Sequence, residues 1–183
     1  MHTVYIGMGA NLPSSAGAPE STLAAAAARL DSLGKIASRS SLYSTEPVGF
    51  AAQPRFVNAV IALETGFAPL DLLKALLAIE QQFGRVRSSG IANGPRTLDL
   101  DILLFDDSSI SEPGLEIPHP RLSERTFVLI PLCEIAPRVI VTGSGMTVSQ
   151  WLDRLREKNG REIDAVVPIQ SDSWRTDTGG VSL

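Results

Sequence analysis

The chain has 183 residues, of which 44% are hydrophobic, and 16 basic against 20 acidic side chains give it a formal net charge of -4. This length supports one well-packed domain and is too short for two ordinary ones. A net negative charge does not favour sequence-independent attraction to a nucleic-acid backbone, so we expect no nucleic-acid partner.

Cysteine content and the first residues bear on the cellular compartment. Cys133 is the only cysteine, so it forms no internal disulfide, and it lies in an apolar run typical of core packing. The chain starts without the basic and apolar regions of a signal peptide, and no apolar stretch reaches the roughly 18 residues of a membrane span. We therefore expect a cytoplasmic protein without membrane contact.

Hydrophobic spacing in the first half of the chain predicts three strands and two helices. Val4, Ile6 and Met8 alternate with other residues before a turn at 9–11, which is typical of a strand. Apolar residues recur every three or four positions after Pro19 and again after Pro69, as in amphipathic helices. The predicted strands cover 3–9, 36–43 and 56–65, and the predicted helices run from 19 to 34 and from 69 to 84.

The second half begins with a segment, 84–97, that holds three arginines and no acidic residue, and that we interpret as a cationic loop. A strand is predicted over 98–105, where an apolar second half indicates a central place in the sheet. A short strand at 115–118 and helices over 127–136 and 148–158 follow. We predict one domain over 1–160 and a partly disordered polar tail over 161–183.

The predicted order of elements is β-α-β-β-α-β, which is that of a ferredoxin-like split β-α-β fold. We therefore expect the α+β class, with a mainly antiparallel sheet and helices packed on it. This topology occurs in proteins of many activities and by itself specifies none of them.

Asp99 and Asp101 are the first candidates for chemistry. Side chains alternate along a strand, so both carboxylates point to one face and Leu98, Leu100 and Ile102 to the other. Two ionised groups this close repel one another, and a bound cation is the simplest compensation. Mg²⁺ suits the pair, because it combines one or two carboxylates with substrate phosphates. The alternative is a carboxylate pair on a solvated strand face, and the Asp-x-Asp pattern alone does not exclude it.

Arginines lie just before the two carboxylates. Arg85, Arg87 and Arg96 belong to the Gly-rich segment, and guanidinium groups pair with phosphate oxygens, although the same segment could be a solvated loop. His119 and Arg125 are further candidates for phosphate contacts, while a single histidine is as often structural. The chain lacks the P-loop pattern and a ligand set for zinc.

These residues are part of longer motifs. The segment Gly-Pro-Arg-Thr-Leu-Asp-Leu-Asp-Ile-Leu-Leu, residues 94–104, resembles the signature of the 6-hydroxymethyl-7,8-dihydropterin pyrophosphokinases, enzymes of folate biosynthesis. Similar segments stand in the family's order at 5–12 (Tyr-Ile-Gly-Met-Gly-Ala-Asn-Leu), 42–49 (Leu-Tyr-Ser-Thr-Glu-Pro-Val-Gly), 53–60, 83–87 and 117–137. The resemblance extends over roughly residues 3–157.

The resemblance implies transfer of diphosphate from ATP to the hydroxymethyl group of the reduced pterin, with AMP as the second product. By similarity, Asp99 and Asp101 bind two Mg²⁺ ions, and Arg85 and Arg96 stabilise charge during the transfer. The ATP-binding positions correspond to Glu80, Arg87, Ile102, His119 and Arg125, and the pterin-binding positions to Thr45, Val48, Phe56, Asn58 and Phe127.

The residue types at the pterin-binding positions suit a flat heterocycle. Two aromatic faces can hold such a ring, and an amide such as Asn58 offers its polar edge both a donor and an acceptor. Taken alone, Phe56 and Phe127 would more often be core residues. Two alternatives stay open: another Asp-x-Asp nucleotidyl or glycosyl transferase, which leaves the Asn58 and phenylalanine set unexplained, and a ferredoxin-like binding module without enzymatic activity. We expect a monomer.

Overall fold

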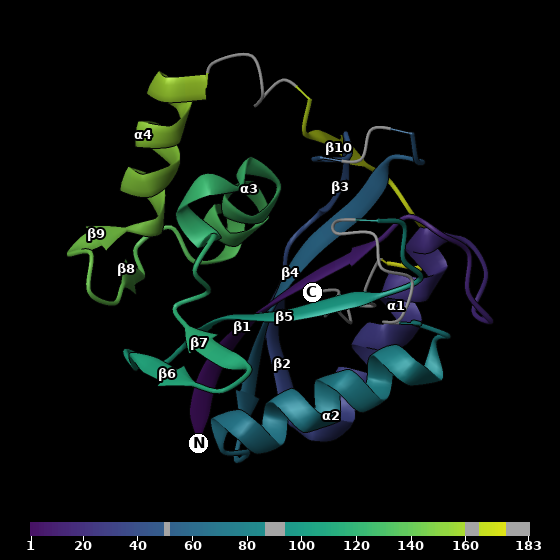
Figure 1. Cartoon of the computed structure of the whole chain (residues 1–183), viewed down its shortest axis with the longest axis horizontal. Helices are drawn as coiled ribbons and strands as arrows, with labels where there is room; N and C mark the ends of the chain where they lie inside the picture. Colours follow the sequence, from purple (N-terminus) through teal and green to yellow (C-terminus); the bar gives the residue numbers. More distant parts are fainter. Residues whose placement is uncertain (50–51, 87–93, 160–164, 175–183) are drawn as a thin grey trace, which may run out of the picture.

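The computed structural model describes residues 1–49, 52–86, 94–159 and 165–174. Six strands form one antiparallel sheet at the centre of these residues (Figure 1). The strands are β1 (His2–Ala10), β2 (Lys35–Arg39), β3 (Leu42–Thr45), β4 (Phe56–Thr65), β5 (Asp99–Phe105) and β10 (Val167–Ile169). Their order is β10-β3-β4-β1-β5, with β2 paired to the far half of β4. The predicted α+β class with a mainly antiparallel sheet is confirmed.

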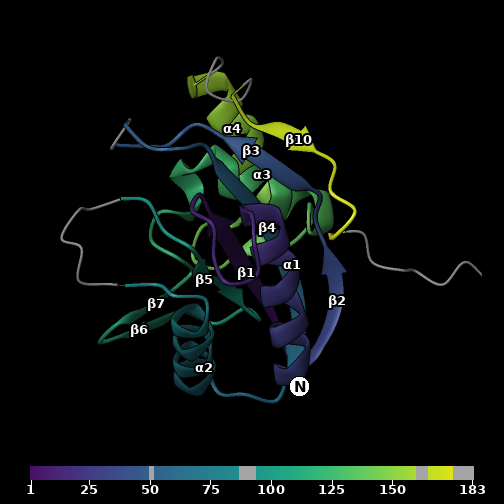
Figure 2. The same cartoon turned by 90° about the vertical axis from the view of Figure 1, so that its right-hand side faces the viewer.

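Helices cover both faces of this sheet (Figures 1 and 2). Helices α1 (Pro19–Leu30) and α2 (Pro69–Gln82) pack on one face, and α3 (Thr126–Ile135) and α4 (Val148–Asn159) on the other. Proline begins both α1 and α2, at a position where its missing N–H has no helical partner to lose. None of the helices in the described residues is long and apolar enough to cross a membrane.

Short elements connect this framework. Two hairpins, β6 (Ile110–Glu112) with β7 (Leu115–Ile117) and β8 (Ile140–Val141) with β9 (Met146–Thr147), flank α3 in the chain, and single 3-10 turns occupy Asp31–Leu33 and Leu122–Glu124. The second of these turns leads directly into α3. It therefore decides where the residues just before α3 lie relative to the sheet.

Strand pairing brings three distant segments into one row. Gly9 on β1 pairs with Asn58 on β4 and, on its other side, with Asp99 on β5. Gly7, two residues earlier, pairs with Asp101. Directly paired residues point to the same face of a sheet, so these polar side chains share the face that α3 covers, away from α1 and α2. The glycines add no side chain between them, and that part of the face stays open.

The strand predicted over 36–43 is in fact two strands, β2 and β3. Ser40, which separates them, is buried; its backbone N–H donates to Val60 O and its Oγ accepts from Val60 N, each at 2.9 Å. A serine hydroxyl thus replaces a backbone carbonyl in the ladder, and regular pairing stops there. The other predicted elements agree with the structure to within a few residues at their ends.

Part of the predicted disordered tail is an ordered part of the domain. Residues 167–169 form β10 and pair with β3, and Trp174 is buried with 8% of its surface exposed. The composition of the tail is polar, but a few residues suffice to pair with an open strand edge and to fill one apolar site. Residues 165–174 therefore pack on the domain, and the division of the chain at residue 160 stays a prediction.

Candidate active site

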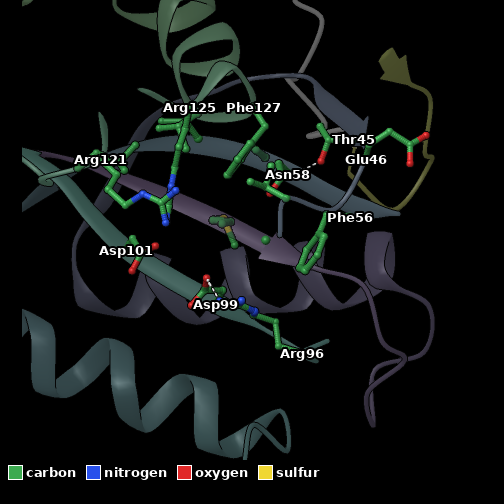
Figure 3. Close-up of a pocket in the computed structure, with 18 residues that line it drawn as sticks. Thr45, Glu46, Phe56, Asn58, Arg96, Asp99, Asp101, Arg121, Arg125 and Phe127 are labelled. Atoms are coloured by element: carbon green, nitrogen blue, oxygen red, sulfur yellow. Dashed lines mark hydrogen bonds and ion pairs between the residues drawn. The ribbon is translucent and has the colours of Figure 1, made fainter. Parts of the chain in front are cut away.

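A cavity opens on the face of the sheet that α3 covers, above the row of Asn58, Gly9 and Asp99 (Figure 3). Its floor comes from β1 and β5, and its walls come from β3, β4 and the segment that leads into α3. Among the lining residues are Gly7, Gly9, Thr45, Val48, Phe56, Asn58, Arg96, Asp99, Asp101, Arg121, Arg125 and Phe127. The cavity thus brings together the predicted metal ligands and all five predicted pterin-binding residues.

Asp99 is held by two arginines. Arg96 Nη1 donates to one carboxylate oxygen at 2.7 Å, and Arg85 Nη1 donates to the other. Burial alone would raise the pKa of Asp99, but the charges of Arg96 and Arg85 outweigh it and hold the pKa below its usual range. Asp99 is therefore a carboxylate at neutral pH, with its orientation set from two sides.

Asp101 has a different environment. Its Oδ2 lies 4.0 Å from His119 Nε2, which is too long for a strong ion pair. The side chain of Asp101 is 41% exposed. Burial and the neighbouring negative charge of Asp99 raise the pKa of Asp101 to about 6, although Arg125 partly opposes this. Among the described residues, the charge of Asp99 is thus neutralised by two arginines, whereas that of Asp101 has no close ion pair, and a bound cation would compensate it.

Glu80 lies beneath the carboxylates, in the last turn of α2. It is 1% exposed, and its Oε1 accepts from Arg85 Nη1 at 3.0 Å and from the backbone N–H of Leu100 at 2.8 Å. Arg85 Nη1 also lies 3.0 Å from Leu98 O. Arg85 is therefore a link between α2 and β5, not a solvated loop residue, and Glu80 is a buried support of this link that does not line the cavity.

Arg96 is positioned through its backbone as well as its side chain. The side chain of Asn11 is buried at the end of β1; its Oδ1 accepts from Arg96 N at 2.8 Å and its Nδ2 donates to Pro54 O at 3.0 Å. The guanidinium of Arg96 lies 5.7 Å from the ring centre of Phe56. We did not predict Asn11 as a site residue, although it belongs to the segment 5–12 that carries part of the family resemblance.

Away from the two carboxylates, the cavity is lined by two phenylalanines and the amide of Asn58. Figure 3 shows Asn58 between Phe127 and Phe56, with Thr45 next to it. Asn58 is 7% exposed and its Nδ2 donates to Thr45 Oγ1 at 2.7 Å, which leaves its Oδ1 toward the Gly9 backbone. The guanidinium of Arg125 lies 5.6 Å from the ring centre of Phe127. Both phenylalanines are partly exposed, so they line a cavity and are not ordinary core residues.

The segment before α3 supplies basic side chains. Arg121 and Arg125 both reach toward Asp101 in Figure 3, and Arg121, which we did not predict as a site residue, lines the cavity. His119 Nδ1 accepts from the backbone N–H of Arg121 at 3.1 Å, and burial together with Arg125 lowers the pKa of His119, so its imidazole is neutral at pH 7. Its place in the segment 117–137, which carries part of the family resemblance, and between His119 and Arg125 was the signal that could have identified Arg121.

Among the predicted ATP-binding residues that the structure describes, Arg125 lines the cavity, whereas Glu80, Ile102 and His119 do not. The side chain of Ile102 is 4% exposed and packs in the core on the α1 and α2 side of the sheet, as strand alternation requires. Arg87 lies outside the described residues.

Solved structures with the same fold include two crystal structures of Plasmodium falciparum HPPK-DHPS. Their TM-scores to this chain are 0.72 and 0.71, at 17% and 16% sequence identity, and each covers 93% of this chain. The chain spans about half of those proteins, 49% and 47% of their length. At these identities the likeness establishes the fold alone.

Sequence relatives are much closer. A 2-amino-4-hydroxy-6-hydroxymethyldihydropteridine pyrophosphokinase of Pseudomonas aeruginosa is 47% identical over 136 residues, which is 73% of this chain and 80% of the relative. A protein of the same name from Methylorubrum extorquens is 37% identical over 157 residues, or 85% of this chain and 94% of the relative. The family model of 7,8-dihydro-6-hydroxymethylpterin-pyrophosphokinase (HPPK) matches residues 5–137. The chain therefore belongs to the 7,8-dihydro-6-hydroxymethylpterin-pyrophosphokinase family, the enzymes that transfer pyrophosphate from ATP to hydroxymethyldihydropterin in folate biosynthesis.

Proposed function

We propose that this chain transfers the diphosphate group of ATP to the hydroxymethyl group of 6-hydroxymethyl-7,8-dihydropterin in a Mg²⁺-dependent reaction that releases AMP. One observation carries the proposal: Asn58 and Asp99 flank Gly9 in a single cross-strand row, beneath one cavity. An amide and aromatic end suited to a pterin thus lies next to a carboxylate and arginine end suited to a metal-bound triphosphate. Direct transfer needs the two substrates side by side in this way.

The carboxylate pair fits Mg²⁺. Asp99 and Asp101 point to one face, and burial together with the negative charge of Asp99 raises the pKa of Asp101. Such hard oxygen ligands, completed by phosphate oxygens, are those that Mg²⁺ takes. Two bound ions would supply charge neutralisation on the transferred group and activation of the attacking hydroxyl. We propose Asp99 and Asp101 as their ligands.

The arginines would complete the charge balance. Arg96 is held at its backbone by Asn11 and at its guanidinium by Asp99, so it projects into the cavity in a fixed position. Fixed guanidinium groups stabilise a transition state that spreads negative charge over phosphoryl oxygens. We propose Arg85 and Arg96 in this role and Arg125, with Arg121 beside it, as further phosphate-binding groups.

The remaining nucleotide-binding proposals differ in their support. His119 is neutral and sits 4.0 Å from Asp101, so it can contact the nucleotide as a hydrogen-bonding group. Glu80 is buried and bonded to Arg85, which supports a positioning role in place of direct contact. For Ile102 only the backbone is a candidate, because its side chain is in the core.

Pterin recognition would use Asn58, whose amide is oriented by Thr45, with Phe56 and Phe127 stacking on the ring and Val48 at the cavity mouth. Val48 is 54% exposed, which suits a residue that a ligand covers. The expected monomeric state and cytoplasmic location stay predictions.

Product analysis tests the proposal. Purified protein is incubated with ATP, Mg²⁺ and 6-hydroxymethyl-7,8-dihydropterin, with parallel reactions that lack the pterin or contain excess EDTA. We expect AMP and the pterin diphosphate in equal amounts only in the complete reaction. Formation of ADP would indicate a kinase that transfers one phosphate. Absence of turnover would favour a binding module, and turnover that persists in EDTA would contradict the metal assignment.

A further inference from the structure

The C-terminal segment of the described chain, residues 165–174, lies along the edge of the sheet beside β3 (Figure 2). We call it the C-terminal strap. Its strand β10 pairs antiparallel with β3, with Val167 opposite Ser44 and Ile169 opposite Leu42. Strand β3 has only four residues and ends at Thr45, which orients Asn58. The strap thus covers the one side of β3 that β4 leaves open.

Trp174 anchors the far end of the strap. It is 8% exposed and belongs to the apolar cluster of the sheet and the α1 and α2 layer. Its indole Nε1 donates to Ser40 O at 2.8 Å, just before β3 begins, and the guanidinium of Arg39 lies 5.5 Å from its ring centre. A buried tryptophan with a satisfied N–H is a strong fixed point for a chain terminus.

Arg55 anchors the near end. Its Nη2 donates to Ala165 O at 3.0 Å and to Ser44 O at 3.2 Å, and its Nε donates to Ser44 Oγ at 2.8 Å. The same guanidinium forms an ion pair with Glu46, which lines the cavity. Arg55 directly precedes Phe56 in the chain. One side chain therefore joins the strap to the two segments that carry Thr45, Phe56 and Asn58.

We infer that the C-terminal strap, through Trp174 and Arg55, positions the pterin-binding corner formed by Thr45, Phe56 and Asn58. This inference rests on the proposed function. With the strap docked, β3 is held between two strands and the Thr45 hydroxyl is fixed relative to Asn58. Without it, β3 becomes a short edge strand with unpaired backbone groups, which moves more freely. The Asp99 and Asp101 end, on β5 at the opposite side of the sheet, does not depend on the strap.

The first test needs no substrate. Amide hydrogen exchange is compared between wild type, Trp174→Ala and the matched control Trp151→Ala, which removes the indole of α4 whose N–H bonds Ser144. We expect exchange over 42–46 to become at least fivefold faster in Trp174→Ala and to stay within twofold in the control. Unchanged exchange over 42–46 in Trp174→Ala would overturn the inference, whether or not the protein is active with the pterin.

The second test separates positioning from general stability. In Trp174→Ala and in Arg55→Ala we expect the KM for the pterin to rise by about fivefold or more, while the KM for ATP and kcat stay within about twofold. Arg156→Ala, which removes an arginine paired only locally with Asp153, serves as the control and should change neither KM. Equal losses for both substrates would show that the strap acts on stability alone and would overturn the inference. Arg55 is 41% exposed at its side chain, so its variant stays informative if Trp174→Ala folds poorly.

The two tests also separate this inference from the proposed function. If the wild type forms no pterin diphosphate, the proposed function fails, and the exchange experiment still decides whether the strap holds β3. If the wild type is active and the variants behave as wild type, the inference alone fails.

Discussion

The guanidinium of Arg85 donates to the buried carboxylate of Glu80 at 3.0 Å and so joins helix α2 to the strand that carries Asp99. Glu80 is also the acceptor for the backbone N–H of Leu100. A charge buried this deeply is tolerated only with its partners in place. The link therefore serves two purposes, because it stabilises the packing of α2 on β5 and it fixes the arginine beside the proposed metal ligand.

Replacing Glu80 tests this link. In Glu80→Ala the free energy of unfolding should fall by about 3–5 kcal/mol, because the partly buried Arg85 loses one of its two carboxylate partners and Leu100 N loses its acceptor. Urea denaturation measures the change. Asp71→Ala is the control in the same helix, since its pair with Lys74 is exposed and should contribute about 0–1 kcal/mol. Similar losses in the two variants would mean that the buried link is not a major contributor.

Asp101 should matter for turnover and little for folding. Its carboxylate is partly exposed and makes no close ion pair with the residues that the structure describes, so Asp101→Ala should retain the wild-type circular dichroism spectrum and unfolding midpoint. Turnover should fall by about two to three orders of magnitude, the size of loss seen when one charge-stabilising group is removed from an active site. Asp107→Ala, an exposed carboxylate just beyond β5, is the matched control. Near wild-type turnover in Asp101→Ala would contradict its assignment as a metal ligand.

Gly9 should be required for space. A Cβ at this position would lie 2.9 Å from Asn58 Oδ1, closer than such atoms approach in proteins. Gly9→Ala should therefore displace the Asn58 amide and raise the KM for the pterin by about tenfold, the effect of losing roughly one hydrogen bond to a charged or polar group. Gly66→Ala is the control, because a Cβ there meets nothing within 4 Å. Equal kinetics for both variants would argue against contact between Asn58 and the pterin.

Tyr43 should make stability depend on pH in the alkaline range. Burial, followed by its hydrogen bond of 2.8 Å to Glu134, raises the pKa of Tyr43 to about 12. A raised pKa means that the native state favours the neutral phenol, so this contribution is complete below the unfolded pKa of about 10 and is lost as the pH rises toward 12. The free energy of unfolding of the wild type should thus fall more steeply between pH 10 and 12 than that of Tyr43→Phe. Parallel curves in urea titrations would contradict this.

Local pattern was sufficient for the carboxylate pair. The two-residue period of a strand predicted that Asp99 and Asp101 share a face opposite Leu100 and Ile102, and the structure agrees, with both leucine and isoleucine in the core. Pro19 and Pro69 likewise predicted where two helices begin, and α1 and α2 begin at these residues. These features depend on residues a few positions away in the chain, and sequence patterns can predict structure over that range.

Features that depend on distant partners could not be predicted. Glu80 and Arg85 are polar residues near a helix end, and only the position of β5 buries them. The burial of Trp174 depends on Ser40 and on an open edge of β3, neither of which its own polar neighbourhood indicates. The break at Ser40 depends in turn on its bonds with Val60. In each of these cases the local structure is set by contacts with residues distant in the sequence.

The row of Asn58, Gly9 and Asp99 has a consequence for the order of synthesis. Strand β1 leaves the ribosome first, but its partner β5 and the Phe127 wall follow only after most of the domain, and the strap follows last. Pairing between such distant segments is slow, because the intervening chain must close before the contacts form. A chain that stops before β5 therefore holds Asn58, the proposed pterin-binding amide, without Asp99 and Asp101, the proposed metal ligands, and we expect it to lack the complete substrate site.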